Sequence, residues 1–143
     1  MGVDGVTRSG TYTLAALSIT TAQASSAQTA ITDLDGMSAA NLVAELLGGT
    51  GGTTVVALVQ TTLDNGATWY DVARFDFNTA DSPPAEGVKF CVVEAESAKA
   101  ITAYAALAVE GVNDGLLGNQ LRAVITSTGT YTNTALAVRA AVH

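Results

Sequence analysis

The stretch that decides the fold is residues 62–69, which read Thr62-Leu63-Asp64-Asn65-Gly66-Ala67-Thr68-Trp69. The preceding residues 55–60 are almost entirely apolar and indicate a strand. The following residues 69–78 alternate with a period of two, which indicates a second strand. Asn65-Gly66 is a tight-turn signal, because both residues tolerate the positive φ that a primed turn needs. The stretch therefore predicts a β-hairpin.

Polar side chains are placed to hold this turn. Asp64 can accept hydrogen bonds from the turn amides, and the Thr68 hydroxyl can close the other side. The eight residues resemble the Asp-box of sialidases and related propeller proteins, Ser/Thr-x-Asp-x-Gly-x-Thr-Trp. Sialidases carry one box per blade, whereas this chain has 143 residues and one box, so it is too short for a propeller. The resemblance implies a structural hairpin formed by Thr62, Asp64, Gly66, Thr68 and Trp69.

Strand patterns recur along the rest of the chain at intervals of about ten residues. The further candidates are residues 11–21, 25–34, 88–95 and 100–109, with 121–127 and 135–142 as a closing hairpin. Residues 78–87 contain both prolines and predict a loop. Eight or nine short strands indicate an all-β protein, an antiparallel β-sandwich of jelly-roll or Ig-like type. Residues 1–10 are interpreted as a flexible arm, and residues 11–143 as a single sandwich domain.

Residues 38–47 are ambiguous. Ser38 could cap a helix that Gly48 ends, or the segment could be a strand with alternate residues facing inward, namely Ala40, Leu42, Ala44 and Leu46. The β surroundings favour the strand. We interpret the glycine-rich residues 48–52 as a flexible link to the next strand. They lack the lysine of a phosphate-binding loop.

The composition excludes several partners. The formal charge of −7 argues against nucleic acid. The longest apolar run, residues 103–109, is far too short to span a membrane. The single Cys91 excludes an intramolecular disulfide and fits assembly in a reducing cytoplasm.

Charged residues make up 13% of the chain, about half the share usual in soluble domains. One interpretation is a small-residue β-domain with a hydroxyl-rich surface. The other is that much of the outside becomes buried against copies of the chain or a larger assembly. We favour the second, because a solitary monomer generally keeps a denser charged surface.

A search for catalytic chemistry finds no constellation that would support an enzyme. The only histidine, His143, is the last residue of the sequence. Asp33 and Asp35 flank a turn, which favours a turn-stabilising role. Glu94 and Glu96 share a strand face, but the spacing suggests no third oxygen ligand for a cation.

The remaining candidates favour packing. Cys91 lies in an apolar strand and is expected to be a small buried hydrophobe rather than a nucleophile. Trp69 with Tyr70 could form a sugar-stacking platform, but Trp69 shares a strand face with Phe75 and Phe77, which favours core or rim packing. We therefore predict no catalytic residue, no cofactor and no metal site.

Three segments together are similar to small β-rich virion structural proteins of tailed bacteriophages and prophages. They are residues 59–73, which contain the hairpin, residues 116–122 (Leu-Leu-Gly-Asn-Gln-Leu-Arg) and residues 128–134 (Thr-Gly-Thr-Tyr-Thr-Asn-Thr). The resemblance spans roughly residues 30–142, and its motifs mark a fold rather than an active site. It implies a role in the virion.

Such β-domains serve as capsid decoration, neck and tail parts. The leading hypothesis is a decoration (cement) protein on the capsid exterior, assembled in the host cytoplasm. Its partners would be the major capsid protein and copies of itself, most simply as a homotrimer at capsomer junctions. The alternatives are a neck or tail component, or a carbohydrate-binding module on the virion.

Overall fold

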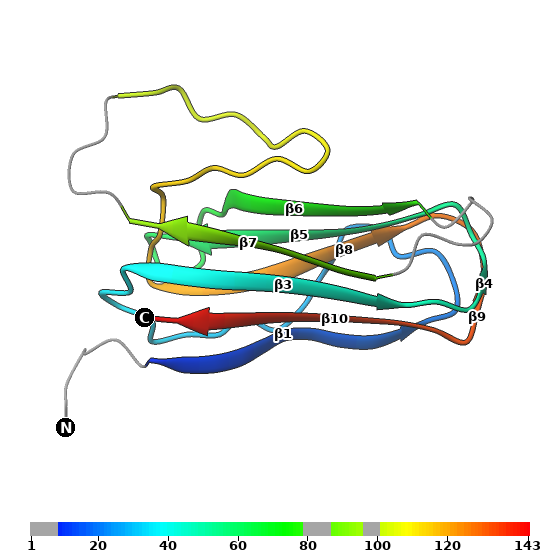
Figure 1. Cartoon of the computed structure of the whole chain (residues 1–143). Helices are drawn as coiled ribbons and strands as arrows, with labels where there is room; N and C mark the ends of the chain where they lie inside the picture. Colours follow the sequence, from blue (N-terminus) through cyan, green and yellow to red (C-terminus); the bar gives the residue numbers. More distant parts are fainter. Residues whose placement is uncertain (1–8, 79–86, 96–100) are drawn as a thin grey trace.

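The computed structural model describes residues 9–78, 87–95 and 101–143, and these form two four-stranded antiparallel sheets packed face to face (Figure 1). Sheet A has the order β1-β10-β3-β7, sheet B has the order β2-β8-β5-β6, and β4 pairs with β9. The strands are β1 (Gly10–Ile19), β2 (Ser26–Ala27), β3 (Ala39–Leu47), β4 (Thr50–Gly51), β5 (Thr54–Thr62), β6 (Tyr70–Asn78), β7 (Gly87–Glu94), β8 (Gln120–Ser127), β9 (Tyr131–Thr132) and β10 (Thr134–Val142). The predicted all-β antiparallel sandwich is confirmed.

The ambiguous segment 38–47 is the strand β3. Its inward residues, Ala40, Leu42, Ala44 and Leu46, are at most 1% exposed. They belong to the same core as Val55, Ala57 and Val59 of β5, which are fully buried. Alternation along β3 therefore gives the correct inward face, as the period of two predicts.

The predicted closing hairpin of β8 and β10 is wrong. β8 pairs with β5 and β2 in sheet B, whereas β10 lies between β1 and β3 in sheet A. Residues 128–133 therefore cross from one sheet to the other, and β9 within them pairs with β4. Turn residues between two strands fit a crossover between layers as well as they fit a hairpin.

Two further strand predictions are corrected. Residues 25–34 hold only the two-residue β2 and an isolated bridge between Ile31 and Leu121. Residues 101–109 form no strand, although their composition favours one, because no neighbouring strand takes up their backbone groups in a ladder. We call residues 101–116 the strap. It runs beside β6 in Figure 1 and leaves Ile101 fully exposed.

The glycine-rich residues 48–52 are a close-packed closure rather than the expected flexible link. A Cβ atom on Gly49 would lie 1.8 Å from the Thr132 carbonyl oxygen. A Cβ atom on Gly52 would lie 1.9 Å from the Tyr131 ring, and Gly52 has a φ of 63°. These glycines are needed because residues 49 and 52, on either side of β4, lie too close to residues 131–133 for a side chain.

Some expectations fall outside the described residues. They are the arm over residues 1–8, the proline loop over residues 79–86 and Glu96. Gly10 of the expected arm already belongs to β1, where it pairs with Val142. Within the residues that the structure describes, no helix is long and apolar enough to cross a membrane.

Replacing Gly49 with alanine is expected to lower the free energy of unfolding by about 1–3 kcal/mol, because the new methyl group overlaps backbone atoms that cannot easily move. Urea denaturation measures this change. The control is Thr50→Ala at the exposed neighbouring position, which should stay within about 0.5 kcal/mol of the wild type. Equal stability of the Gly49→Ala protein would contradict the close packing of this closure.

Candidate functional site

The turn between β5 and β6 is held by its own polar side chains. The Thr68 amide and the Thr62 hydroxyl each donate to Asp64 Oδ1 at 2.8 Å, and the Gly66 amide donates to Thr62 Oγ1 at 3.0 Å. The bonds that Asp64 accepts, that of the Thr68 amide first and that of the Thr62 hydroxyl second, lower the pKa of its carboxyl group. Asn65 and Gly66 have positive φ values of 58° and 96°. The connection is longer than a two-residue hairpin, since β5 ends at Thr62 and β6 begins at Tyr70.

Trp69 packs at the rim of the sandwich. The Arg122 guanidinium lies over its ring, 4.2 Å from the ring centroid, and Arg122 Nε donates to Gln60 Oε1 at 2.9 Å. Burial lowers the pKa of Arg122. Trp69 is half-buried and is not part of the core cluster with Phe75 and Phe77. The register shift between Val59 and Gln60 explains this, because it interrupts the alternation near the start of β6.

Tyr70 has a different neighbour, the strap residue Tyr104. Their rings meet edge to face with centroids 5.1 Å apart, and the Tyr104 hydroxyl accepts a hydrogen bond from the Asp71 amide at 3.0 Å. The two rings border a hollow of about 510 Å³ whose lining includes Asn113 and Asp114. Trp69 is not among its lining residues.

The remaining sequence candidates are not brought together. His143 is exposed, and its backbone pairs with that of Ala39 at 2.9 Å. Asp33 and Asp35 are exposed near the turn before β3, and Asp33 has a positive φ of 60°. Glu94 is exposed at the end of β7. In the described part of the chain, no three side chains of the metal-ligating types lie close enough to hold an ion.

Cys91 is half-buried and packs against the core. Burial, together with the negative charge of Asp114, raises the pKa of its thiol to about 11. The thiol therefore stays protonated near neutral pH, and it lacks the thiolate character that a nucleophile needs.

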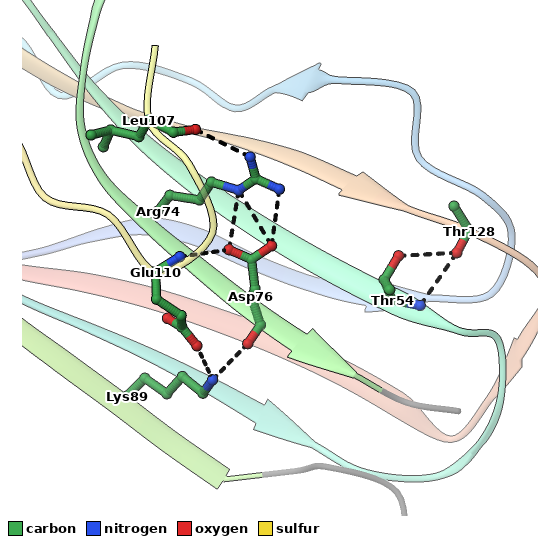
Figure 2. A network of polar contacts seen from close by, with 7 residues as sticks. All are labelled: Thr54, Arg74, Asp76, Lys89, Leu107, Glu110 and Thr128. Atoms are coloured by element: carbon green, nitrogen blue, oxygen red, sulfur yellow. Dashed lines mark hydrogen bonds and ion pairs between the residues drawn. The ribbon is translucent and has the colours of Figure 1, made fainter. Parts of the chain in front are cut away.

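Charged side chains anchor the strap to the edge of sheet B (Figure 2). Arg74 binds the Asp76 carboxylate at 3.0 Å and donates to the Leu107 carbonyl oxygen at 3.2 Å. The same carboxylate accepts a hydrogen bond from the Glu110 amide at 3.2 Å. Lys89 of β7 donates to the Asp76 carbonyl oxygen at 2.7 Å and pairs with Glu110. The network thus ties β6, β7 and the strap together.

The anchored strap covers part of the outer face of sheet B. The Leu107 amide donates to Asp71 Oδ2 at 3.1 Å, which holds this part of the strap at β6. Ala106 and Leu107 line a hollow of about 290 Å³ together with Val56 and Val124, which point outward from sheet B. Sheet B is therefore shielded on both faces, by the core and in part by the strap.

The outer face of sheet A is different. We call this surface the assembly face. The strand register places on it alternate residues from each of the four strands of sheet A. They are Thr11, Thr13, Ala16 and Ser18 of β1; Ala135, Ala137, Arg139 and Ala141 of β10; Asn41, Val43, Glu45 and Leu47 of β3; and Val88, Phe90, Val92 and Glu94 of β7. Phe90 is 78% exposed and Leu47 57%. A shallow hollow of about 280 Å³ lies on this face between Ala16, Leu47 and Ala137.

Sequence reasoning missed the assembly face. The local signal is the alternation in residues 88–95, which puts Val88, Phe90 and Val92 on one side of the strand and Val93 on the other. Lys89 lies on the same side as Val93, so the pattern alone would place the more apolar side, with Phe90, in the core.

Comparison with protein-family models, curated proteins and solved structures found no match to this chain.

Removing the Asp64 carboxylate is expected to loosen the turn. Asp64→Ala should lower the melting temperature, because the Thr68 amide and the Thr62 hydroxyl lose their acceptor. Asp64→Asn keeps one oxygen and should lower it less. Calorimetry measures both changes.

The pH dependence gives a second readout. The folded pKa of Asp64 lies below its ordinary value of 3.8, so the carboxylate contributes stability above that pH and loses it as the pH falls through the folded pKa. The stability advantage of the wild type over Asp64→Asn should therefore shrink below about pH 3.8. A difference that stays constant down to pH 2 would contradict this role of the charge.

Proposed function

We propose that this chain is a bacteriophage virion structural protein, a capsid decoration protein that stabilises the head. It binds as an oligomer at capsomer junctions on the capsid exterior. A homotrimer at three-fold positions is the simplest arrangement. Its partners are the major capsid protein and copies of itself, and it assembles in the host cytoplasm.

The observation that carries this proposal is the assembly face. Large apolar side chains are exposed on this face, namely Leu47, Val88, Phe90 and Val92. Exposed apolar side chains that gather on one sheet face are typical of an interaction surface. The small side chains of β10 and β1 allow another protein surface to approach closely.

The net charge supports an exterior position, because a formal charge of −7 repels the packaged DNA. The assembly face carries Glu45, Glu94 and Arg139, so charges of both signs are present where it would meet a protein shell. The function then consists of burying surface across a junction between capsid subunits, with no chemical step.

A neck or tail component would use the same face to form a ring. The copy number per particle separates the two roles, because decoration proteins occur in numbers close to that of the capsid protein. Six or twelve copies per particle would indicate a ring instead.

A carbohydrate-binding module is a second candidate, favoured by the hollow beside Tyr70 and Tyr104. Trp69 supports it less, since Arg122 lies over its ring. Binding of the wild-type protein to a glycan array is the observation that would favour this candidate over decoration.

The proposal is tested by adding purified protein to isolated capsids that lack it. We expect saturable binding in numbers near that of the capsid protein, and a higher temperature of capsid disruption. Ala137→Glu places a carboxylate in the middle of the assembly face and should weaken binding by roughly tenfold or more, because an unpaired charge would be buried.

Leu63→Glu is the matched control. It adds the same charge at a side chain that is 58% exposed in the turn after β5, away from the assembly face. Binding should stay close to that of the wild type. Equal binding by the Ala137→Glu and Leu63→Glu proteins, with both folded, would refute the use of the assembly face.

A further inference from the structure

The two sheets have four edge strands, and three of them are protected against pairing with another chain. β2 has only two residues. β1 is interrupted by a register shift between Thr13 and Ala15. The strap covers the edge of β6, where Arg74 N donates to the Gly111 carbonyl oxygen and Asn113 N to the Val72 carbonyl oxygen, both at 3.0 Å. Short edge strands, bulges and covering loops are the usual protection against edge-to-edge association.

The fourth edge strand, β7, contacts the strap only at its end, through Glu94 and Ala95, and the described residues give it no such protection between residues 88 and 92. Ala95 N donates to the Ser38 carbonyl oxygen at 2.8 Å, which lies on the β3 side. Backbone groups alternate in direction along a strand, so the even-numbered residues of β7 point theirs away from β3. Glu94 N agrees with this, since it donates to Asp114 Oδ1 at 2.8 Å. Among the described residues, no backbone partner beyond β3 is present for residues 88, 90 and 92.

The side chains of β7 also favour pairing. Val88, Phe90 and Val92 are 57%, 78% and 47% exposed. A charged side chain that points inward on an edge strand often prevents pairing with another chain. Lys89 is such a residue in β7, but its ammonium group is already bound within the molecule by the Asp76 carbonyl oxygen and by Glu110. The edge thus combines free backbone groups with apolar side chains and has no free charge between residues 88 and 92.

We propose that β7 pairs antiparallel with β7 of a second copy around a two-fold axis at Phe90. This register uses all the outward backbone groups of residues 88, 90 and 92, about six hydrogen bonds. Phe90 then faces its counterpart, and each Val88 faces a Val92. Aromatic cross-strand pairs of this kind stabilise a sheet.

The charges permit this contact between two acidic molecules. In the proposed register Lys89 stands opposite Cys91 of the other copy, and burial keeps the Cys91 thiol uncharged. No like charges face each other between residues 88 and 92. A second copy therefore meets little repulsion here, although each chain carries a formal charge of −7.

The place of this contact in a particle rests on the proposed function. Neighbouring three-fold positions on a closed shell are related by local two-fold axes, so a β7 pair would join adjacent clusters of the decoration protein into a net. The contact itself requires only two copies of the chain, so it can be tested without particles.

The register is tested by a disulfide. In a hydrogen-bonded antiparallel pair, opposite Cα atoms lie about 5.5 Å apart, within the range that a disulfide spans. The double variant Phe90→Cys, Cys91→Ser should form a covalent dimer under mild oxidation, seen on a non-reducing gel and by mass spectrometry. In the wild type the two Cys91 residues would stand about 8 Å apart, too far to bridge.

The matched control is Leu47→Cys in the same Cys91→Ser background. Leu47 is on the same face and is 57% exposed, but β3 lies inside sheet A. This variant should form no covalent dimer under the same oxidation. Crosslinking at 47 as efficient as that at 90, or none at 90, would overturn the β7 pairing.

Sedimentation equilibrium gives the non-covalent counterpart. The wild type should dimerise with a dissociation constant in roughly the micromolar range, as expected for a small interface. Phe90→Lys would place two ammonium groups opposite each other and should raise the dissociation constant about tenfold or more. Leu47→Lys should leave the dissociation constant unchanged. A wild type that remains monomeric at about 1 mM would also overturn the proposal.

The two proposals fail separately. If the protein binds capsids but gives no crosslink at residue 90, the β7 contact is wrong and the decoration role stands. If the β7 dimer forms but the protein does not bind or stabilise capsids, the decoration role is wrong and the β7 contact stands.

Discussion

The burial of alternate residues of β3 is the constraint on which the rest of the structure depends. Ala40, Leu42, Ala44 and Leu46 are at most 1% exposed, and they face the buried residues of β5 across the sandwich. A slip of one residue would exchange the two faces of the strand and bring Glu45 into the core. The register of β3 therefore also fixes what its neighbours β10 and β7 present outward, and so the composition of the assembly face.

The two outer faces of the sandwich differ because of the strap. Its attachment is polar, through Asp71, Arg74 and Asp76, and it brings Leu107 over the outer face of sheet B. Sheet A has no such cover among the described residues, and its largest outward side chain, Phe90, remains exposed. This asymmetry is why the proposed function uses sheet A.

Local patterns were sufficient for part of this structure. The β surroundings favoured a strand over residues 38–47, and period-two alternation then predicted its inward residues. Asp64 and Gly66 marked the turn between β5 and β6. The pairing of strands was not predictable in the same way. The sequences of β8 and β10 each indicate a strand, but only the packing of the two layers determines that they belong to different sheets. The strap has strand-like composition but no neighbouring strand to pair with. Gly49 and Gly52 look like flexible residues in a sequence, because close approach to residues 131–132 is visible only in three dimensions.

The central claim is that the assembly face meets the capsid. Hydrogen–deuterium exchange of the protein, free and bound to isolated capsids, tests it most directly. The account predicts that binding slows exchange in β3, β7 and β10, while exchange in the strap and in the turn around Asp64 is unchanged. Slowed exchange confined to the strap and sheet B, with sheet A unchanged, would contradict it.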